Sequence, residues 1–134
     1  MSALSVKNLS VHSGHKQRLN NLSFSVETGS RGAIICPNGA GKSTALQALL
    51  QLIPAQFDEL SYFGHAAHQL SRKNLSKLVA YVPQTHPSLN STVWDWCIYA
   101  RAPYQTFGFF LTPEEYDTIL HILEITNLLH YKDT

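Results

Sequence analysis

The stretch Cys36–Thr44 combines residue types that hold phosphate groups in proteins. Gly39 and Gly41 let the backbone approach an anion closely, and Lys42 brings an ammonium group to it. Ser43 adds a hydroxyl that can bind Mg²⁺. These residues match the pattern G-x-x-x-x-G-K-[ST], in which backbone N–H groups at the start of a helix surround a phosphate. The predicted phosphate-binding residues are Cys36, Pro37, Asn38, Gly39, Ala40, Gly41, Lys42, Ser43 and Thr44.

One position departs from this pattern, because Cys36 stands where the first glycine is expected. Glycine is favoured where φ is positive or where a side chain does not fit. We therefore expect Cys36 to alter the entry of the loop and to weaken phosphate binding without abolishing it, since Gly39 and Gly41 remain.

The residues around the loop predict the elements that position it. Ile34–Cys36 predicts an apolar strand before the loop, and Thr44–Leu52 predicts a helix after it. This strand, loop and helix context distinguishes a phosphate loop from a chance Gly-Lys-Ser turn. Further upstream, Leu4–Val11 predicts a strand with imperfect alternation, and Leu22–Val26 predicts a half-buried strand with strict alternation.

Shorter elements follow the loop helix. Leu60–Gly64 predicts an edge strand, and Leu70–Leu78 predicts a helix capped by Ser71. Val79–Val82 predicts an apolar strand that stops at a proline. Gln84 then follows at the carboxyl end of that strand, where α/β sheets place ligand-binding groups.

The remainder of the chain is predicted to be helical. Thr92 caps a helix over Val93–Ala100, and Thr112 begins a second helix with proline and two glutamates in its first turn. The second helix carries an apolar stripe at helical spacing, formed by Tyr116, Ile119, Leu120 and Leu123. Several aromatic residues of this region serve packing or, alternatively, form a surface for a partner or for self-association. They are Trp94, Trp96, Tyr99, Tyr104, Phe107, Phe109 and Phe110.

The composition is that of one soluble globular domain, with 134 residues of which 44% are hydrophobic. A net charge of +1 gives little support for sequence-independent nucleic-acid binding. No apolar run is long enough to span a bilayer. Two unpaired cysteines, Cys36 and Cys97, favour a reducing compartment, and the scattered histidines are expected to be solvated rather than to bind a metal.

The order of these features resembles the N-terminal half of the ATP-binding subunits of ABC transporters, from about Ala3 to Thr134. Cys36–Thr44 resembles the Walker A loop, and Ala80–Gln84 resembles the Q-loop. The resemblance implies an α/β fold, the P-loop NTPase fold of ABC ATPases. Residues 1–84 would form a β-subdomain and an incomplete P-loop nucleotide-binding core, and residues 85–134 the start of a helical subdomain. The segments Tyr81–Gln84 and Ala100–Tyr104 look most like importers of iron-siderophores, haem and cobalamin.

This resemblance also implies roles for individual residues. Lys42 and Gln84 would act in catalysis, with Lys42 on the β- and γ-phosphates and Gln84 positioning the attacking water and coupling to membrane subunits. Ser43 and Gln84 would bind Mg²⁺, for which oxygen ligands are suited. In the family an aromatic ring stacks on adenine, and Ser13 stands at that place. His12 is the weak candidate for replacing it, together with the nearby His15.

A complete subunit would pair with a second ATP-binding subunit and with membrane permease subunits, and would energise transport by ATP binding and hydrolysis at the cytoplasmic face of the membrane. This sequence ends before the family's signature motif, its catalytic Asp-Glu strand and its switch histidine, and looks truncated. We therefore expect ATP and Mg²⁺ binding without turnover. Two alternatives remain open: a non-hydrolysing regulatory nucleotide-binding module, and an inactive fragment held by packing to a partner. A small-molecule kinase is a weaker option, because it does not explain Tyr81–Gln84.

Overall fold

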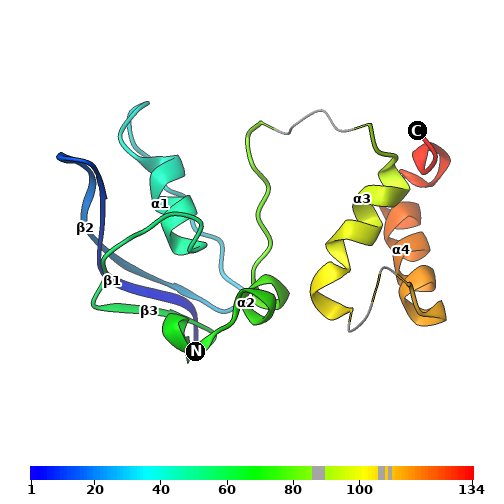
Figure 1. The fold of residues 1–134 in the computed structure, drawn as a ribbon, viewed down its shortest axis with the longest axis horizontal. Coiled ribbons are helices and arrows are strands. Elements are labelled where there is room, and N and C mark those ends of the chain that lie inside the picture. The colour runs from blue at the N-terminus through cyan, green and yellow to red at the C-terminus, as the bar shows by residue number, and fades with distance from the viewer. Residues whose placement is uncertain (86–89, 106–107, 109) are drawn as a thin grey trace. The chain divides into compact units, whose positions relative to one another are not determined.

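The computed structural model describes residues 1–134 except 86–89, 106, 107 and 109 (Figure 1). The chain forms two compact units, Met1–Val79 and Ala80–Thr134. This boundary lies a few residues before the predicted domain boundary at residues 84 and 85, and the assignment of those domains remains a prediction.

The first unit is built on a four-stranded antiparallel sheet with the order β2-β1-β3-β4. Its strands are β1 (Ser2–Ser13), β2 (Lys16–Glu27), β3 (Glu59–Tyr62) and β4 (His65–Ala66). The two predicted N-terminal strands are therefore confirmed, and so is the strand near Leu60. The prediction that this last strand lies at the edge is wrong, because a turn at Phe63 and Gly64 returns the chain and pairs His65 with Tyr62.

The imperfect alternation of β1 arises from a bulge at Asn8. Val6 pairs with Phe24 and Leu9 pairs with Leu22, so β1 has one residue more than β2 between these pairs. Asn8 takes a positive φ of 53°, a conformation that asparagine adopts more readily than most residues. The extra residue keeps Val6 and Leu9 on the same buried face.

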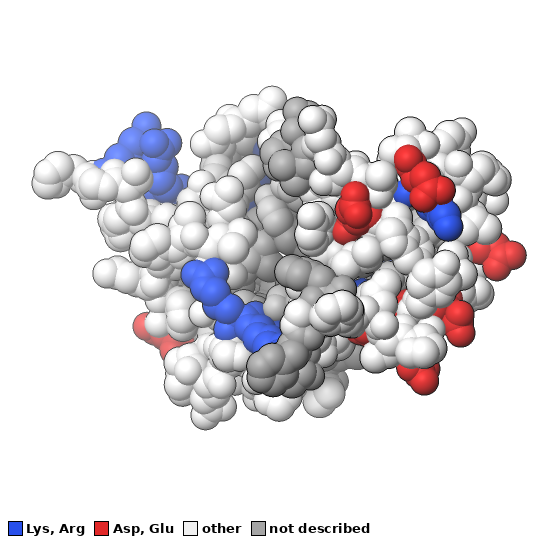
Figure 2. Space-filling model, turned by 45° about the vertical axis from the view of Figure 1, so that its right-hand side comes forward, with Lys and Arg blue, Asp and Glu red and all other residues white. Residues whose placement is uncertain are grey.

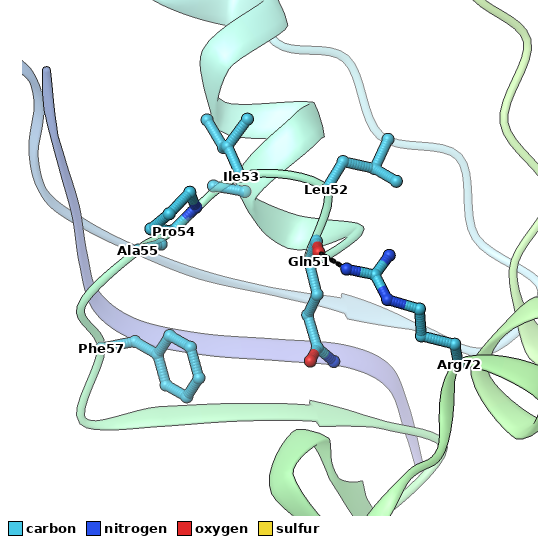
Figure 3. Close-up of a pocket in the computed structure, with 8 residues that line it drawn as sticks. Gln51, Leu52, Ile53, Pro54, Ala55, Phe57 and Arg72 are labelled. Carbon is cyan, nitrogen blue, oxygen red and sulfur yellow. Dashed lines mark hydrogen bonds between the residues drawn. The ribbon is translucent and has the colours of Figure 1, made fainter.

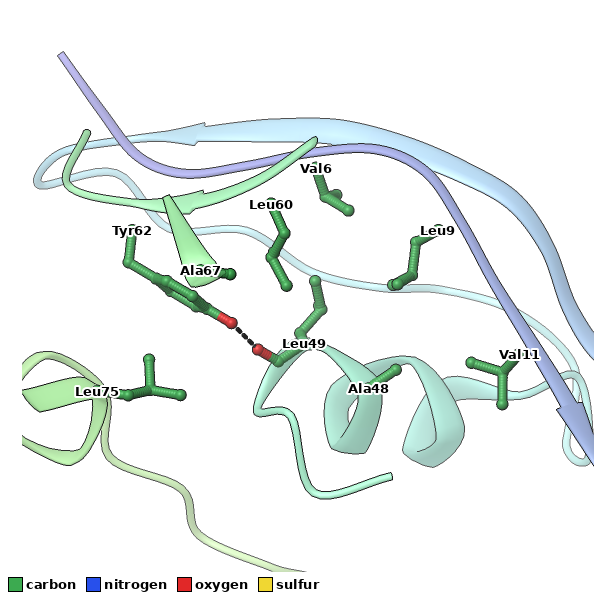
Figure 4. Close-up of a cluster of buried hydrophobic side chains, with 9 residues drawn as sticks. All are labelled: Val6, Leu9, Val11, Ala48, Leu49, Leu60, Tyr62, Ala67 and Leu75. Atoms are coloured by element: carbon green, nitrogen blue, oxygen red, sulfur yellow. Dashed lines mark hydrogen bonds between the residues drawn. The ribbon is translucent and has the colours of Figure 1, made fainter. Parts of the chain in front are cut away.

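One hydrophobic core lies between the sheet, α1 (Lys42–Leu49) and α2 (Arg72–Leu78), with the short 3₁₀ helix η1 (Ala67–Gln69) at its edge. Its buried members are Val6, Leu9, Val11, Ala48, Leu49, Leu60, Tyr62, Ala67 and Leu75 (Figure 4). The Tyr62 hydroxyl donates to the carbonyl of Leu49, one of the helix-end carbonyls that has no partner within α1 (Figure 4). Burial raises the pKa of Tyr62.

The predicted α2 helix and its cap are confirmed, because the Ser71 hydroxyl accepts from the N–H of Asn74 at 3.2 Å. The two other predicted strands, Ile34–Cys36 and Val79–Val82, are wrong, since both segments are irregular. A strand needs a neighbour for its backbone groups, and every strand of the described residues belongs to the sheet β2-β1-β3-β4. As a result Ile35 is 92% exposed and Val82 is 83% exposed.

The second unit is helical, as the sequence predicts. It contains α3 (Val93–Ala100), η2 (Ala102–Tyr104), α4 (Pro113–Ile125) and η3 (Leu129–Tyr131). Thr92 and Thr112 form capping boxes with Asp95 and Glu115, which confirms both predicted helix starts. The first N–H groups of α3 are also satisfied, since those of Val93 and Trp94 donate to carbonyls near the C-terminal end of the chain.

Helices α3 and α4 pack through the predicted stripe of α4. Ile119 and Leu123 are buried, and the ring of Tyr116 meets Trp94 edge to face at 5.0 Å between centroids. Arg101 pairs with Glu115 at 3.1 Å and lies over the Tyr104 ring. Two of the aromatic residues predicted as a sticky surface, 107 and 109, lie outside the described residues. The others do not gather into one cluster within the described part, so the structure does not support self-association through them.

Candidate functional site

The predicted phosphate loop leads directly into α1. Gly39 and Gly41 have positive φ values of 81° and 101°, and Gly41 is the N-cap residue of the helix. The helix begins with the hydrogen bond from the N–H of Ala45 to the carbonyl of Gly41, at 2.8 Å. Gly41 has no side chain that could cap the first turn, so the N–H groups of Lys42 and Ser43 have no capping partner. This is the arrangement that binds anions at helix N-termini.

Strand β2 lies close behind the loop at Gly41. A Cβ atom on Gly41 would lie 3.0 Å from the backbone carbonyl oxygen of Arg18, whereas a Cβ on Gly39 would meet nothing within 4 Å. Gly41 is therefore required both by its φ and by the close approach of β2, and Gly39 is required by its φ alone.

The lysine of the loop is held by the loop itself. The Lys42 Nζ donates to the carbonyl of Cys36 at 2.7 Å and to the carbonyl of Pro37 at 3.2 Å. An ammonium group has three N–H donors, so one donor remains for a phosphate oxygen. The ammonium is thus held at the loop before any anion binds.

Cys36 causes no backbone strain at the loop entry. The non-glycine residues with positive φ in the described chain are Asn8, Asn21, Gln51, Phe63 and Asn127. Cys36 is not among them, so its backbone conformation is one that any residue can adopt. The expected distortion of the loop entry is therefore not seen in the backbone, and the effect of Cys36 on ATP affinity remains a prediction.

The adenine-stacking candidates lie in the same pocket as the end of the phosphate loop. A pocket of about 310 Å³ lies beside α1, and both His12 and Ser13 line it together with Thr44. His15 is not among the residues that line this pocket. The remaining lining residues are Val11, Arg18, Ile53 and Pro54. Sequence reasoning missed Arg18 and the Ile53–Pro54 turn, because their position depends on strand register and on the path of the chain after α1.

Gln84 belongs to the second unit, where it is exposed in an irregular segment directly before residues 86–89. The strand that was expected to present it is absent. Its roles in binding Mg²⁺ and in positioning water therefore remain predictions.

A second pocket, of about 350 Å³, lies at the other end of α1 (Figure 3). It is lined by Ala48, Gln51, Leu52, Ile53, Pro54, Ala55, Phe57 and Arg72. An Nη of Arg72 donates to the backbone carbonyl of Gln51 at 3.3 Å (Figure 3). None of the predicted site residues lines this pocket.

The two units carry opposite charge. Residues 1–79 contain eight Lys and Arg against three Asp and Glu, whereas residues 80–134 contain two against six. Figure 2 shows Lys and Arg in blue and Asp and Glu in red. The net charge of +1 therefore conceals a basic first unit, which favours a polyphosphate anion near the loop.

Among the residues that the structure describes, no three His, Cys, Asp or Glu side chains come together as a metal site. No helix of the described chain is long and apolar enough to cross a membrane.

Comparison with known proteins identifies the same family that the order of sequence features resembles. A family model described as "ABC transporter" matches residues 19–134. The iron(3+)-hydroxamate import ATP-binding protein FhuC of Bacillus subtilis is 30% identical over 99% of this chain and 50% of its own length. A probable iron chelatin transport ATP-binding protein of Helicobacter pylori is 35% identical over 97% of this chain and 49% of its own. A solved ATP-binding subunit of an ABC transporter matches with a TM-score of 0.77 and 26% identity, covering 98% of this chain and 53% of that one. The chain thus spans about half the length of the curated relatives it matches.

Proposed function

Because the chain belongs to the ABC transporter family, we propose that it is an ATP-binding component of an importer for iron-siderophore, haem or cobalamin complexes. Its fold is the mixed α/β N-terminal portion of the ABC ATPase fold, as the sequence predicted. The names of similar proteins support the choice of cargo: iron(3+)-hydroxamate and iron chelatin for the two described above, and hemin for HmuV of Vibrio parahaemolyticus, which is 30% identical over 98% of this chain and 49% of its own length.

The observation that carries this proposal is the geometry of the loop before α1. Lys42 lies at the start of α1, and one of the three N–H donors of its ammonium group is not used by the loop carbonyls. The N–H groups of the first turn of α1 have no side-chain cap. In the proposed complex these donors bind the β- and γ-phosphates. Thr44 lies further along α1, at the pocket where the ribose and base would extend.

The Mg²⁺ ion of the nucleotide would be held by Ser43 and Gln84. Ser43 is exposed at the start of α1 beside Lys42, so its hydroxyl is accessible to an ion carried by the phosphates. A hydroxyl and an amide carbonyl are oxygen donors of the kind that Mg²⁺ prefers. The ion would neutralise charge on the phosphates.

We propose binding without turnover for these 134 residues. The sequence contains neither a Leu-Ser-Gly-Gly-Gln segment nor an apolar strand ending in Asp-Glu. Groups that act as a catalytic unit lose most of their effect together when one is removed. Transport would then require a second ATP-binding subunit and permease subunits, with the chain at the cytoplasmic face of the membrane.

A second candidate is an inactive fragment that packs against a partner. Ile35 and Val82 favour it, because the segments predicted as apolar strands expose these large apolar side chains. This candidate differs from the first in requiring no nucleotide.

Equilibrium titration with Mg-ATP, together with a phosphate-release assay, separates these functions. The proposal expects micromolar binding that is lost in Lys42→Ala, weaker Mg²⁺ dependence in Ser43→Ala, and no phosphate release. Release of phosphate that disappears in Lys42→Ala would contradict binding without turnover. Absence of binding in the unmodified chain would contradict the nucleotide function and favour the fragment.

A further inference from the structure

Arg18 occupies a bulge of β2 beside the phosphate loop. Val11 pairs with Leu19 and His12 pairs with Gln17, so the pairing of these two strands skips Arg18. Bulges of this kind re-aim a side chain and are over-represented next to active sites. The carbonyl oxygen of Arg18 lies only 3.0 Å from the place that a Cβ on Gly41 would take. The bulge therefore sets Arg18 directly against the start of α1.

Arg18 is one of the residues that line the 310 Å³ pocket, together with Thr44. Val11, Ile53 and Pro54 give the same pocket an apolar part beside the charged Arg18. A volume of this size is at the lower end of the range for small-molecule sites. A flat heterocycle suits this lining, because its edges can contact apolar groups while its face meets a guanidinium plane.

The Arg18 guanidinium is exposed and makes no ion pair or hydrogen bond with the described part of the chain. Lys42, in contrast, already has two carbonyl partners. Arg18 is thus the cation of this pocket that is available to a ligand. A guanidinium is planar and weakly hydrated, so it stacks on aromatic rings more readily than a lysine ammonium does.

We propose that Arg18 holds the base of the bound nucleotide by stacking its guanidinium plane on the ring, a role that rests on the proposed nucleotide binding by the loop. Ser13 stands where the family resemblance implies an aromatic residue, and a serine offers no ring face. Arg18 replaces that ring from the neighbouring strand. Stacking tolerates different bases because every base has a π-face, so the chain binds Mg-ATP and Mg-GTP with affinities within a few-fold of each other.

The test compares two ligands that differ in the base. Mg-ATP carries the base and Mg-tripolyphosphate does not, and both are titrated into the unmodified chain, Arg18→Ala, Arg18→Lys and Arg18→Tyr. Base stacking is worth enough that Arg18→Ala weakens Mg-ATP binding about tenfold, with tripolyphosphate affinity unchanged. Arg18→Lys stays as weak as Arg18→Ala, because it keeps the charge without the plane, and Arg18→Tyr regains affinity. Lys16→Ala is the matched control, because Lys16 is an exposed cation near Arg18 that does not line the pocket, and it changes Mg-ATP affinity much less.

Other outcomes overturn the proposal. Unchanged Mg-ATP affinity in Arg18→Ala, with binding still dependent on Lys42, removes the role of Arg18 and leaves the loop intact. Equal loss of both ligands, with rescue by Arg18→Lys, assigns Arg18 to the phosphates instead. If the unmodified chain binds neither ligand, the nucleotide function itself fails. Arg18 is exposed, so these variants retain the thermal melt of the unmodified chain.

Discussion

The two glycines of the loop before α1 differ in how closely other atoms approach them, and alanine substitutions measure the effect of this difference on stability. Gly39 and Gly41 both have positive φ, at 81° and 101°. A left-handed backbone costs a non-glycine residue about 1–2 kcal/mol. Gly39→Ala should therefore lower the free energy of unfolding by about 1–2 kcal/mol, because its new methyl group meets no atom within 4 Å.

Gly41→Ala carries the same backbone cost and a close contact in addition. Its methyl carbon would lie 3.0 Å from the carbonyl oxygen of Arg18, which is a main-chain atom of β2. Forcing such a contact costs about 1–3 kcal/mol further, so the total loss is about 2–5 kcal/mol. Because stability is typically about 5–15 kcal/mol, the second variant loses a large share of it.

Urea denaturation followed by circular dichroism measures both losses on the same chain. The order of the two variants is the critical result, since they share the φ effect and differ in the contact. Equal destabilisation of Gly39→Ala and Gly41→Ala would refute the close packing of β2 against the loop. A Gly41→Ala protein as stable as the unmodified chain would refute the φ argument as well.

Three further changes test the hydrophobic core of the first unit, the buried side of α4 and the start of α4. Tyr62→Phe leaves the Leu49 carbonyl without its donor and should cost about 1–3 kcal/mol in urea denaturation. Leu123→Ala, at 1% exposure, should cost about 2–5 kcal/mol in thermal or urea unfolding, whereas Ile122→Ala, at 46% exposure, should cost under about 1 kcal/mol. The pKa of Glu115 is lowered from 4.5, mainly by a backbone N–H at the start of α4 and also by the facing guanidinium. The ionised Glu115 stabilises the folded state above its unfolded pKa, and this effect is lost as the pH falls through its lowered folded pKa. In Glu115→Gln the helix content, measured by circular dichroism, should therefore fall less steeply as the pH is lowered.

For each of these three predictions, one result would contradict it. Unchanged stability in Tyr62→Phe would mean that the Leu49 carbonyl finds another donor. Similar losses in Leu123→Ala and Ile122→Ala would mean that α4 does not bury the predicted stripe. If the helix content of Glu115→Gln falls with pH as it does in the unmodified chain, other carboxylates cause the pH dependence.

The elements that the sequence predicted correctly are those with local signals. Thr92 and Thr112 specify helix starts through their own side chains and the residues three positions later, and both capping boxes form. The glycine turn that leads into α1 is equally local, because its glycines, lysine and hydroxyl are consecutive or nearly so, and its binding of phosphate stays a prediction. The fold class followed from the order of these features, and the comparisons confirm it.

The predictions that were wrong concern strands whose formation depends on pairing with distant parts of the chain. Ile34–Cys36 and Val79–Val82 have the composition of buried strands, but composition does not supply a neighbouring strand, and both remain irregular here. The bulges that seat Asn8 and Arg18 depend on the register between β1 and β2. Register is set by contacts between distant residues, so the place of Arg18 in the pocket could not be read from its position in the sequence.

Amide chemical shifts of the ¹⁵N-labelled chain, followed during titration with Mg-ATP, report directly on whether the loop before α1 binds the nucleotide. The chain has a mass of 15.0 kDa, which suits the method. Binding at the loop should produce saturable changes in the amide shifts of Gly39, Gly41, Lys42 and Ser43, and these changes should be lost in Lys42→Ala. Absence of shifts at saturating Mg-ATP, or shifts confined to the second pocket around Gln51, would contradict nucleotide binding at the phosphate loop.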